Sequence, residues 1–494
     1  MTKQLQLLEA YFRDLLTVRQ SGAGVKEESY YDALSNLLNG IGGGLKPRVR
    51  CIMQLGNRGA GRPDGGLFTE DQWKQGDHHR PLLGLPQPPN RGVIEVKPTG
   101  DDAWVSADSR QVTGYWQHYR QVLVANYRDF VLVGQDQEGN PVKLETYRLA
   151  GSEAEFWTET AHPTAFARRH AATFIEFLRR VMLHAAPLAT PRDVAWFLAS
   201  YARTAMARIE GQDLPALAAV RKALEEALGL KFVGDKGEHF FRSTFVQTLF
   251  YGVFSAWVLW CKGRPPTSEE RFRWHDTSLN LRVPIVQKLF YMMAEPAALR
   301  SLGLVEVLEW AASALNRVDR ASFFSAFEEG RAVQYFYEPF LEAFDPELRK
   351  EVGVWYTPPE IVQYMVARVD TVLREELGLA DGLADPNVYV LDPCCGTGSY
   401  LVEVLRCVHK TLREKSGDAL VGADVKAAAK GRVFGFEILP APFVVAHLQL
   451  GLLLQNLGAP LANGPHERAG VYLTNALTGW EPLDPEKEKA FQAM

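Results

Sequence analysis

The chain has 494 residues, of which 47% are hydrophobic and 23% charged, a composition typical of a globular protein with a large buried core. This length leaves room for about three domains at roughly 150 residues each. The formal net charge of −5 at pH 7 argues against nucleic acid binding over the whole surface, but it permits a local basic groove.

The five cysteines contain no C-x-x-C pair, so the sequence indicates neither a zinc site nor a disulfide framework. The polar N-terminus predicts no signal sequence, and we find no apolar run long enough to span a bilayer. We therefore expect reduced thiols and a cytoplasmic protein.

The first 150 residues are expected to form an α/β domain, because helical and strand-like apolar patterns alternate there. Between the first two predicted strands, residues 56–90 are rich in glycine and proline and are expected to be a long polar loop. Residues 122–126 are interpreted as a helix before the last strand. The predicted helices cover 4–19 and 27–38, and the predicted strands cover 49–55, 92–96 and 130–133.

Residues 151–345 show helical periodicity almost throughout and carry no pattern with obvious chemistry. We interpret them as an all-helical connector between two catalytic modules. Its clearest helices are predicted over 166–184, 193–209, 214–228 and 242–260.

Residues 346–494 return to alternating strands and helices, which predicts a parallel, doubly wound, Rossmann-like sheet. The predicted strands cover 388–391, 432–436 and 471–473, and the predicted helices cover 400–414 and 442–456.

A glycine loop, D-P-C-C-G-T-G over 392–398, joins the first of these strands to its helix. Glycine lets the backbone approach a ligand closely, and the loop presents amide groups at a helix N-terminus. Such a loop alone is weak evidence, since many structural turns look the same. Glu437 ends the next strand, where a Rossmann-like half places its ribose-binding carboxylate, although an ordinary strand-end charge is the alternative.

Two further motifs decide between these readings. The stretch G-V-W-Y-T-P-P-E over 353–360 resembles the Y-T-P motif that precedes D-P-x-x-G-T-G in N6-adenine DNA methyltransferases, and V-Y-L-T-N over 471–475 resembles their third motif. The resemblance implies S-adenosylmethionine as cofactor. It implies that the methionine end of the cofactor lies at Tyr356, Thr357 and Pro358, and that the loop around the cofactor is formed by Asp392, Pro393, Gly396 and Gly398. It also implies that Glu437 binds the ribose and that Asn475 binds the adenine, at a position where aspartate is more usual.

Methylation of an exocyclic amine in this family also needs an N-P-P-Y or D-P-P-Y tetrapeptide, which binds and stacks on the flipped adenine. The sequence contains neither tetrapeptide. We therefore expect the chain to be the front part of a longer enzyme or a subunit that a partner completes with this motif and a target-recognition domain.

A second motif set lies near the N-terminus. Arg62-Pro63-Asp64 is followed, 31 residues after Asp64, by Glu95-Val96-Lys97, which fits the PD-(D/E)XK pattern of a large nuclease superfamily. Asp64 and Glu95 would hold Mg²⁺ together with the Val96 carbonyl, since Mg²⁺ takes oxygen ligands and polarises the scissile phosphate. Lys97 would position the attacking water or stabilise the developing negative charge.

Neighbouring residues support the nuclease interpretation. Glu28 lies where this superfamily often keeps a further carboxylate, and Gln111 and Tyr115 fit the Q-x-x-x-Y motif of its RecB-like branch. The alternative is that Glu95 and Lys97 form an exposed strand pair, while Gln111 is a helix surface residue and Asp64 a turn residue.

The order of nuclease, helical connector and methyltransferase core resembles type IIG and single-polypeptide type I restriction–modification enzymes. The sequence has no G-x-x-x-x-G-K-[ST] loop, so no ATP-driven motor is predicted. The resemblance implies an antiviral defence enzyme that binds double-stranded DNA, methylates adenine N6 and cuts DNA with a metal-dependent endonuclease. Two alternatives stay open: a methyltransferase whose N-terminal domain only grips DNA, and a non-catalytic, cofactor-sensing defence subunit.

Overall fold

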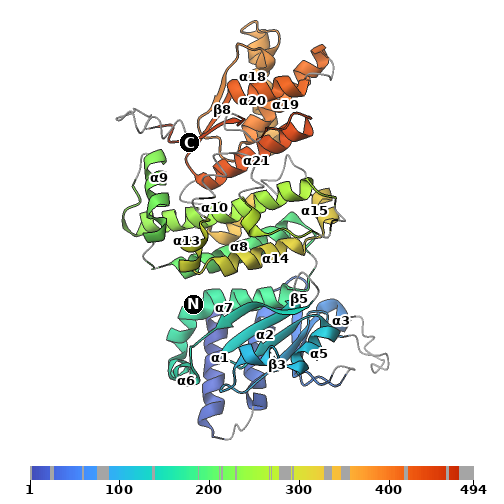
Figure 1. Ribbon diagram of the computed structural model, residues 1–494, viewed down its shortest axis with the longest axis vertical. Coiled ribbons are helices and arrows are strands. Elements are labelled where there is room, and N and C mark those ends of the chain that lie inside the picture. Colours follow the sequence, from blue (N-terminus) through green and yellow to red (C-terminus); the bar gives the residue numbers. More distant parts are fainter. Residues whose placement is uncertain are drawn as a thin grey trace. The chain divides into compact units, whose positions relative to one another are not determined.

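The chain forms two compact units, residues 1–187 and 188–494 (Figure 1). Each unit has its own sheet and its own buried core, and each is described by itself. The structure is a computed structural model that describes residues 3–22, 27–57, 61–74, 88–135, 140–186, 188–210, 212, 215–228, 231–265, 268, 270–277, 291, 294–326, 336–346, 357–416, 421–462 and 467–477.

A six-stranded mixed sheet forms the centre of the first unit (Figure 1). Its strands lie in sequence order, and neighbours are antiparallel except for β3 and β4, which are parallel. A parallel pair needs a crossover connection, which here contains the helices α4 and α5. The bounds are β1 Val49–Met53, β2 Gly65–Thr69, β3 Val93–Val96, β4 Val122–Ala125, β5 Asp129–Gln135, β6 Pro141–Arg148, α4 Ala103–Ser106 and α5 Arg110–Tyr119.

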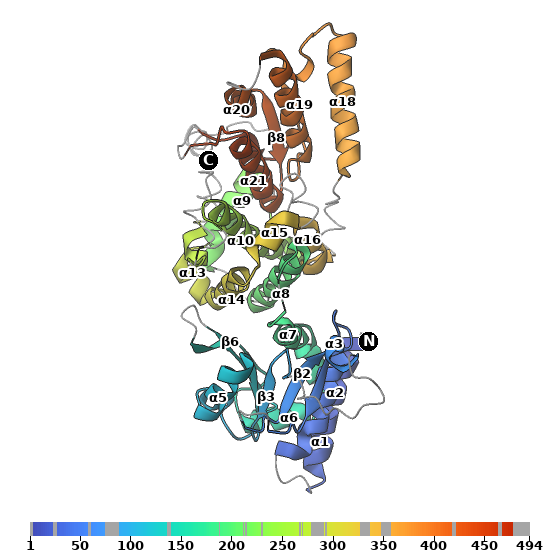
Figure 2. The same cartoon turned by 90° about the vertical axis from the view of Figure 1, so that its right-hand side faces the viewer.

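Figure 2 shows helices beside this sheet, and buried side chains cover both of its faces. Ile94 and Leu123 belong to a core shared with α1, α2, α6 and α7, whereas Val93 and Val124 belong to a second core shared with α5. Successive side chains of a strand point to opposite faces, so Glu95 lies on the same side as Val93. The helix bounds are α1 Lys3–Gln20, α2 Tyr31–Gly42, α6 Glu153–Thr160 and α7 Pro163–Leu183.

The boundary of the first unit lies at 187, beyond the predicted position near 150. Phe156 of α6 and Phe166 and Phe174 of α7 are buried in the same core as Phe12 of α1, with the Phe12 and Phe166 rings stacked at a centroid distance of 4.4 Å. Helical periodicity identified these helices but could not tell which sheet they cover. The first two helices of the predicted connector, α6 and α7, therefore belong to the first unit.

Several local predictions in the first unit were wrong. Residues 122–125 form the central strand β4 and not a helix, and the predicted loop 56–90 contains β2 and the short helix α3, Glu70–Lys74. The strand β2 was not recognised in the sequence because it begins with Gly65-Gly66, and glycine is typical of turns. In the strand, glycine avoids a clash, since a Cβ atom at Gly66 would lie 2.7 Å from Leu55. The helix predicted over 27–38 begins as a 3₁₀ turn, Glu27–Tyr30, and continues as α2.

The second unit begins with a helical block around the long helix α10. By length and composition alone α10 could cross a membrane, contrary to our expectation, but 94% of its most apolar window is buried, as in the core helix of a globular unit. The described helices of this block are α8 Pro191–Ile209, α9 Ala218–Leu228, α10 Gly234–Lys262, α13 Pro296–Ser301, α14 Val305–Asn316, α15 Arg320–Ala326 and α16 Glu338–Phe344.

The rest of the second unit contains a parallel sheet with the strand order β7-β8-β9. This confirms the predicted parallel strands, while the doubly wound arrangement stays a prediction because the described residues hold three strands of this sheet. The helix α21 is buried on nearly all sides and packs against α10. The bounds are β7 Val390–Asp392, β8 Val433–Glu437, β9 Gly470–Leu473, α18 Pro359–Glu375, α19 Ser399–Ser416, α20 Val421–Gly431 and α21 Pro440–Asn456.

Candidate functional site

The glycine loop between β7 and α19 has two positions that a side chain would disturb in different ways. Gly396 and Gly398 have positive φ angles of 57° and 84°. A Cβ atom at Gly398 would lie 3.1 Å from the Cβ of Ala446 on α21, so glycine here permits close helix packing. A Cβ atom at Gly396 would meet no protein atom within 4 Å, because Gly396 faces a cavity.

Hydrogen bonds hold the loop in place from three directions. The backbone N–H of Cys395 donates to the Phe436 carbonyl of β8 at 2.9 Å. The buried side chain of Gln449, on α21, donates from Nε2 to the Thr397 carbonyl at 2.6 Å. The Asp392 carboxylate accepts from the Cys394 N–H at 3.1 Å. These three hydrogen bonds stabilise the conformation of the loop.

The cavity beside the loop has a volume of about 500 Å³, which lies in the usual range for small-molecule sites. Its walls come from the loop, from the ends of β8 and β9, and from two more distant segments. The lining residues are Phe240, Thr357, Pro393, Cys394, Cys395, Gly396, Thr397, Ser399, Tyr400, Glu437, Ile438, Leu439, Pro442, Thr474, Asn475, Ala476 and Leu477.

Glu437 is the buried carboxylate of this cavity. It ends β8, and its Oε1 accepts the Leu439 N–H at 2.7 Å. Burial raises the pKa of Glu437, although the backbone amides of Leu439 and Gly396 act in the opposite direction. A carboxylate at the end of a parallel strand, beside a glycine loop, can accept hydrogen bonds from the hydroxyls of a ribose.

Five of the predicted cofactor residues line this one cavity: Thr357, Pro393, Gly396, Glu437 and Asn475. The other predicted residues have different surroundings.

Asp392 caps the loop and Gly398 packs on α21, while Pro358 precedes α18. Tyr356 lies outside the described residues. Phe240 could not be recognised from the sequence, since it lies on α10, more than a hundred residues before the loop.

We expect Gln449→Met to weaken ligand binding at this cavity and to lower the free energy of unfolding by about 1–3 kcal/mol. Methionine keeps the volume of the side chain but leaves the buried Thr397 carbonyl without its donor. Calorimetry with S-adenosylmethionine and denaturant unfolding measure the two effects. Gln455→Met, on the same helix but outside the cavity lining, is the matched control, and equal affinities of the two variants would contradict the prediction.

A second group of candidate residues lies on the sheet of the first unit. The register of β2 and β3 pairs Gly65 with Ile94, which places Asp64 opposite Glu95. The Asp64 carboxylate accepts the Val96 N–H at 2.7 Å and the Tyr31 hydroxyl at 2.6 Å. The structure thus brings together the two predicted carboxylates from separate strands.

Glu95 is almost fully buried at 2% exposure, which excludes the alternative of an exposed strand pair for this residue. Its Oε1 accepts from Nζ of Lys97 at 2.6 Å, whereas its buried Oε2 has no hydrogen-bond donor. The pKa of Glu95 is raised from 4.5 to about 7, mainly by burial and also by the charge of Asp64, while Lys97 acts in the opposite direction. A buried carboxylate oxygen that lacks a donor and faces a second carboxylate fits a cation ligand.

Two of the remaining predicted residues, Gln111 and Tyr115, contact each other on α5. Gln111 donates from Nε2 to the Tyr115 hydroxyl at 3.0 Å, one turn along α5. Burial raises the pKa of Tyr115, and the charges of Glu95 and Asp64 add to this effect.

Glu28 is exposed in the 3₁₀ turn before α2. Its neighbour Glu27, which the sequence analysis did not identify, carries a charge that raises the pKa of Lys97. The Tyr127 hydroxyl donates a hydrogen bond to the Glu27 carbonyl at 2.5 Å.

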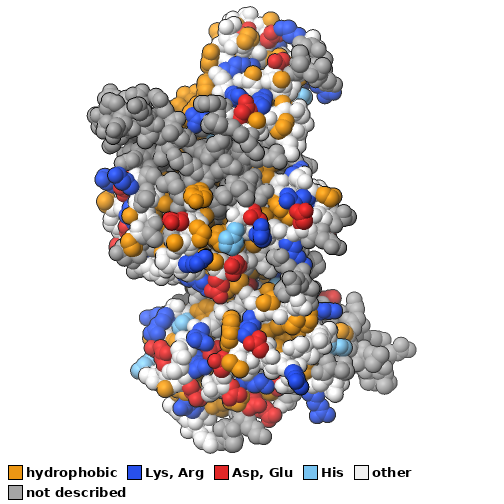
Figure 3. Space-filling model, in the orientation of Figure 1, with side chains coloured by type: hydrophobic (Ala, Val, Ile, Leu, Met, Phe, Trp, Pro, Cys, Tyr) orange, Lys and Arg blue, Asp and Glu red, His pale blue; other side chains and the backbone are white. Residues whose placement is uncertain are grey.

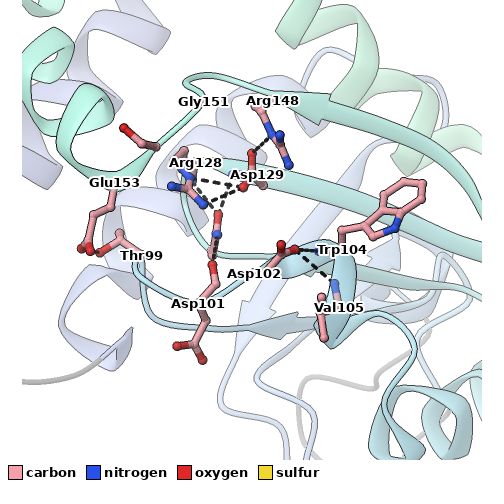
Figure 4. A network of polar contacts seen from close by, with 12 residues as sticks. Thr99, Asp101, Asp102, Trp104, Val105, Arg128, Asp129, Arg148, Gly151 and Glu153 are labelled. Carbon is pink, nitrogen blue, oxygen red and sulfur yellow. Dashed lines mark hydrogen bonds and ion pairs between the residues drawn. The ribbon is translucent and has the colours of Figure 1, made fainter.

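A polar network anchors the segment that follows Lys97 (Figure 4). Asp102 caps α4 by accepting the N–H groups of Trp104 and Val105 at 2.8 and 3.1 Å. Thr99 donates its hydroxyl to Glu153 of α6 at 2.6 Å. Asp129 forms ion pairs with Arg128 and Arg148 at 2.9 and 2.8 Å, at the start of β5. The chain is therefore held firmly on the C-terminal side of Lys97.

We expect the stability of the first unit to fall as pH rises from about 4.5 to 7 when a chelator is present. The folded pKa of Glu95 lies above its unfolded value, so the folded state binds more protons in this interval and loses that advantage on deprotonation. Unfolding curves at pH 5 and 8 measure the change. Glu95→Gln should remove this part of the pH dependence, and an unchanged slope in that variant would contradict the assignment.

Comparison with known proteins gives one family match. Residues 331–454 match the model of the N-6 DNA methylase family. Among curated proteins, no match was found.

Several solved structures show weaker likeness. The DrdV–DNA complex is 19% identical, with a TM-score of 0.40 over 99% of this chain and 42% of that chain. A nuclease-deletion mutant of the type ISP restriction–modification enzyme LlaGI, in complex with a DNA substrate mimic, is 18% identical, with a TM-score of 0.37 over 57% and 24%. The type IIG restriction endonuclease BpuSI is 12% identical, with a TM-score of 0.22 over 94% and 43%. This chain spans less than half the length of each, and likenesses of this strength establish neither an activity nor a partner for it.

Proposed function

We propose that this chain, which contains an N-6 DNA methylase domain, binds S-adenosylmethionine in the cavity at the glycine loop and takes part in methylating adenine N6 in DNA. The observation that carries the proposal is the convergence of Gly396, Glu437 and Asn475 on one cavity inside the second unit. Family members use S-adenosylmethionine, and the donors present fit it.

Each end of the cofactor would meet suitable groups. Glu437 would accept hydrogen bonds from the ribose hydroxyls, and the fixed loop at Gly396 would let the backbone lie close to the ligand. Asn475, which accepts the Leu477 N–H at 3.0 Å through its side-chain oxygen, would face the adenine. When bound, the cofactor supplies an electrophilic methyl group on its sulfonium.

The binding of the target base is assigned to residues outside this sequence, because the sequence contains no N-P-P-Y or D-P-P-Y motif. A further segment or a partner subunit would supply that motif together with the target-recognition domain.

Calorimetry of the chain with S-adenosylmethionine tests the cofactor site directly. Saturable binding is expected even where the chain alone does not methylate DNA, and a folded chain that shows no binding would overturn the proposal.

We further propose that the first unit is a metal-dependent DNA endonuclease. The specific observation is the buried Oε2 of Glu95, which has no donor and lies opposite Asp64. Mg²⁺, held by Asp64, Glu95 and the Val96 carbonyl, would polarise the scissile phosphate. Among the described residues no three metal-binding side chains gather, so water would complete the coordination.

Methylation and cleavage by one polypeptide would make the protein a restriction–modification enzyme of antiviral defence that acts on double-stranded DNA. Figure 3 shows that the described acidic and basic side chains are interspersed on the visible face of the first unit. This face therefore carries no continuous basic stripe among its described residues.

A further inference from the structure

The helical block reaches the cavity through one aromatic side chain. Phe240 stands in the first third of α10 and lines the same cavity as Gly396 and Glu437. The helix α10 packs against α21, whose first residues also line the cavity. A residue of the helical block and the residues of the methylase sheet thus face the same ligand space.

The surroundings of Phe240 hold its ring in position without covering it. Phe232, which is 4% exposed, lies against the Phe240 ring at a centroid distance of 5.7 Å and an interplanar angle of 36°. Phe240 itself is half-buried. A ring supported from one side and open on the other can stack on a flat apolar group.

The chemistry of the cavity indicates which part of the ligand the ring meets. The methionine end of S-adenosylmethionine carries an ammonium, a carboxylate and a sulfonium, whereas its adenine is the flat part. The apolar lining includes Ile438, Leu439 and Pro442, which directly follow the ribose candidate Glu437 along the chain. An aromatic side chain suits the adenine end, where stacking is favourable for any purine.

We propose that Phe240 is a cofactor-binding residue that covers the adenine of S-adenosylmethionine. The bound cofactor then bridges α10 and the glycine loop and tightens the packing of the helical block on the methylase sheet. This inference rests on the proposed cofactor site and adds a specific contact to it.

The test compares S-adenosylmethionine binding by the full chain and three variants in calorimetry. Phe240→Ala should weaken binding about 10-fold or more, since truncating a stacking aromatic has an effect of this size. Phe240→Trp should retain binding and report it through a change in its fluorescence. Val233→Ala, which alters an exposed apolar residue next to the start of α10 and outside the cavity lining, should bind as the unchanged chain does.

Hydrogen exchange separates a cofactor contact from a loss of packing. S-adenosylmethionine should slow amide exchange in the first half of α10 in the unchanged chain and in Phe240→Trp, but much less in Phe240→Ala. Binding by the unchanged chain together with equal affinity of Phe240→Ala would overturn the inference and leave the proposed cofactor site intact. Failure of the unchanged chain to bind would overturn both.

Discussion

Gly396→Ala is expected to weaken S-adenosylmethionine binding by about 10-fold to 100-fold, because the new methyl group would project into the proposed cofactor cavity. No protein atom lies within 4 Å of that position, so the substitution fills ligand space and does not displace the fold. The positive φ of 57° adds backbone strain of about 1–2 kcal/mol, which lowers the stability of the second unit.

Gly458→Ala is the matched control for this experiment. Gly458 also has a positive φ, of 72°, and open space at its Cβ position, but it lies outside the cavity lining. Both variants should therefore lose similar stability, while the affinity should fall in Gly396→Ala alone. Equal affinities in calorimetry would show that Gly396 does not face the cofactor.

Asp64→Asn and Glu95→Gln are each expected to lower metal-dependent DNA cleavage by about 1,000-fold, because each removes a charged oxygen ligand from the proposed Mg²⁺ site. Loss of charge at Glu95 should not unfold the first unit, since burial already favours the protonated form. Cleavage of plasmid DNA with Mg²⁺ and with a chelator measures the effect. Calorimetry with S-adenosylmethionine should show the second unit unaffected.

Neighbouring acidic residues provide graded controls for the nuclease experiment. Glu27→Gln should lower cleavage moderately, because the charge of Glu27 acts on Lys97, whereas Glu28→Gln on the exposed side of the same turn should have a smaller effect. Asp108→Asn alters an exposed carboxylate that pairs with Lys143 and should cut DNA normally. DNA binding without any cleavage by the unchanged chain would favour the alternative that this unit only grips DNA.

Short motifs could be recognised in the sequence because each lies within a few consecutive residues. The structure places residues of the D-P-C-C-G-T-G loop and Glu437 on one cavity and Asp64 opposite Glu95, while the roles of these residues stay predictions. Two helices, α19 and α20, occupy the chain between the glycine loop and the strand that ends at Glu437.

The failures share a physical cause, which is that packing between distant segments leaves no local pattern. Helical spacing in 153–183 predicted helices but not the sheet that they cover. Phe240 looks like any apolar residue of a buried helix, and its place in the cavity depends on α10 meeting α21. The choice between Glu27 and Glu28 depended on a 3₁₀ turn that the periodicity did not reveal.

The parallel pairing of β3 with β4 has a consequence for where chemistry can reside in the first unit. In a hairpin, a short turn joins two neighbouring antiparallel strands, so this turn covers the end of the first strand. The connection from β3 to β4 must instead leave the sheet, cross over it through α4 and α5, and re-enter at the opposite end.

Glu95 and Lys97 lie at the C-terminal end of β3, where the chain leaves the sheet, and Gln111 and Tyr115 lie on α5, the helix that precedes β4. The same geometry recurs in the second unit, where the glycine loop and Glu437 follow the ends of the parallel strands β7 and β8. In both units, parallel pairing leaves open strand ends, and the loops there can change in length and composition while the sheet below them stays the same.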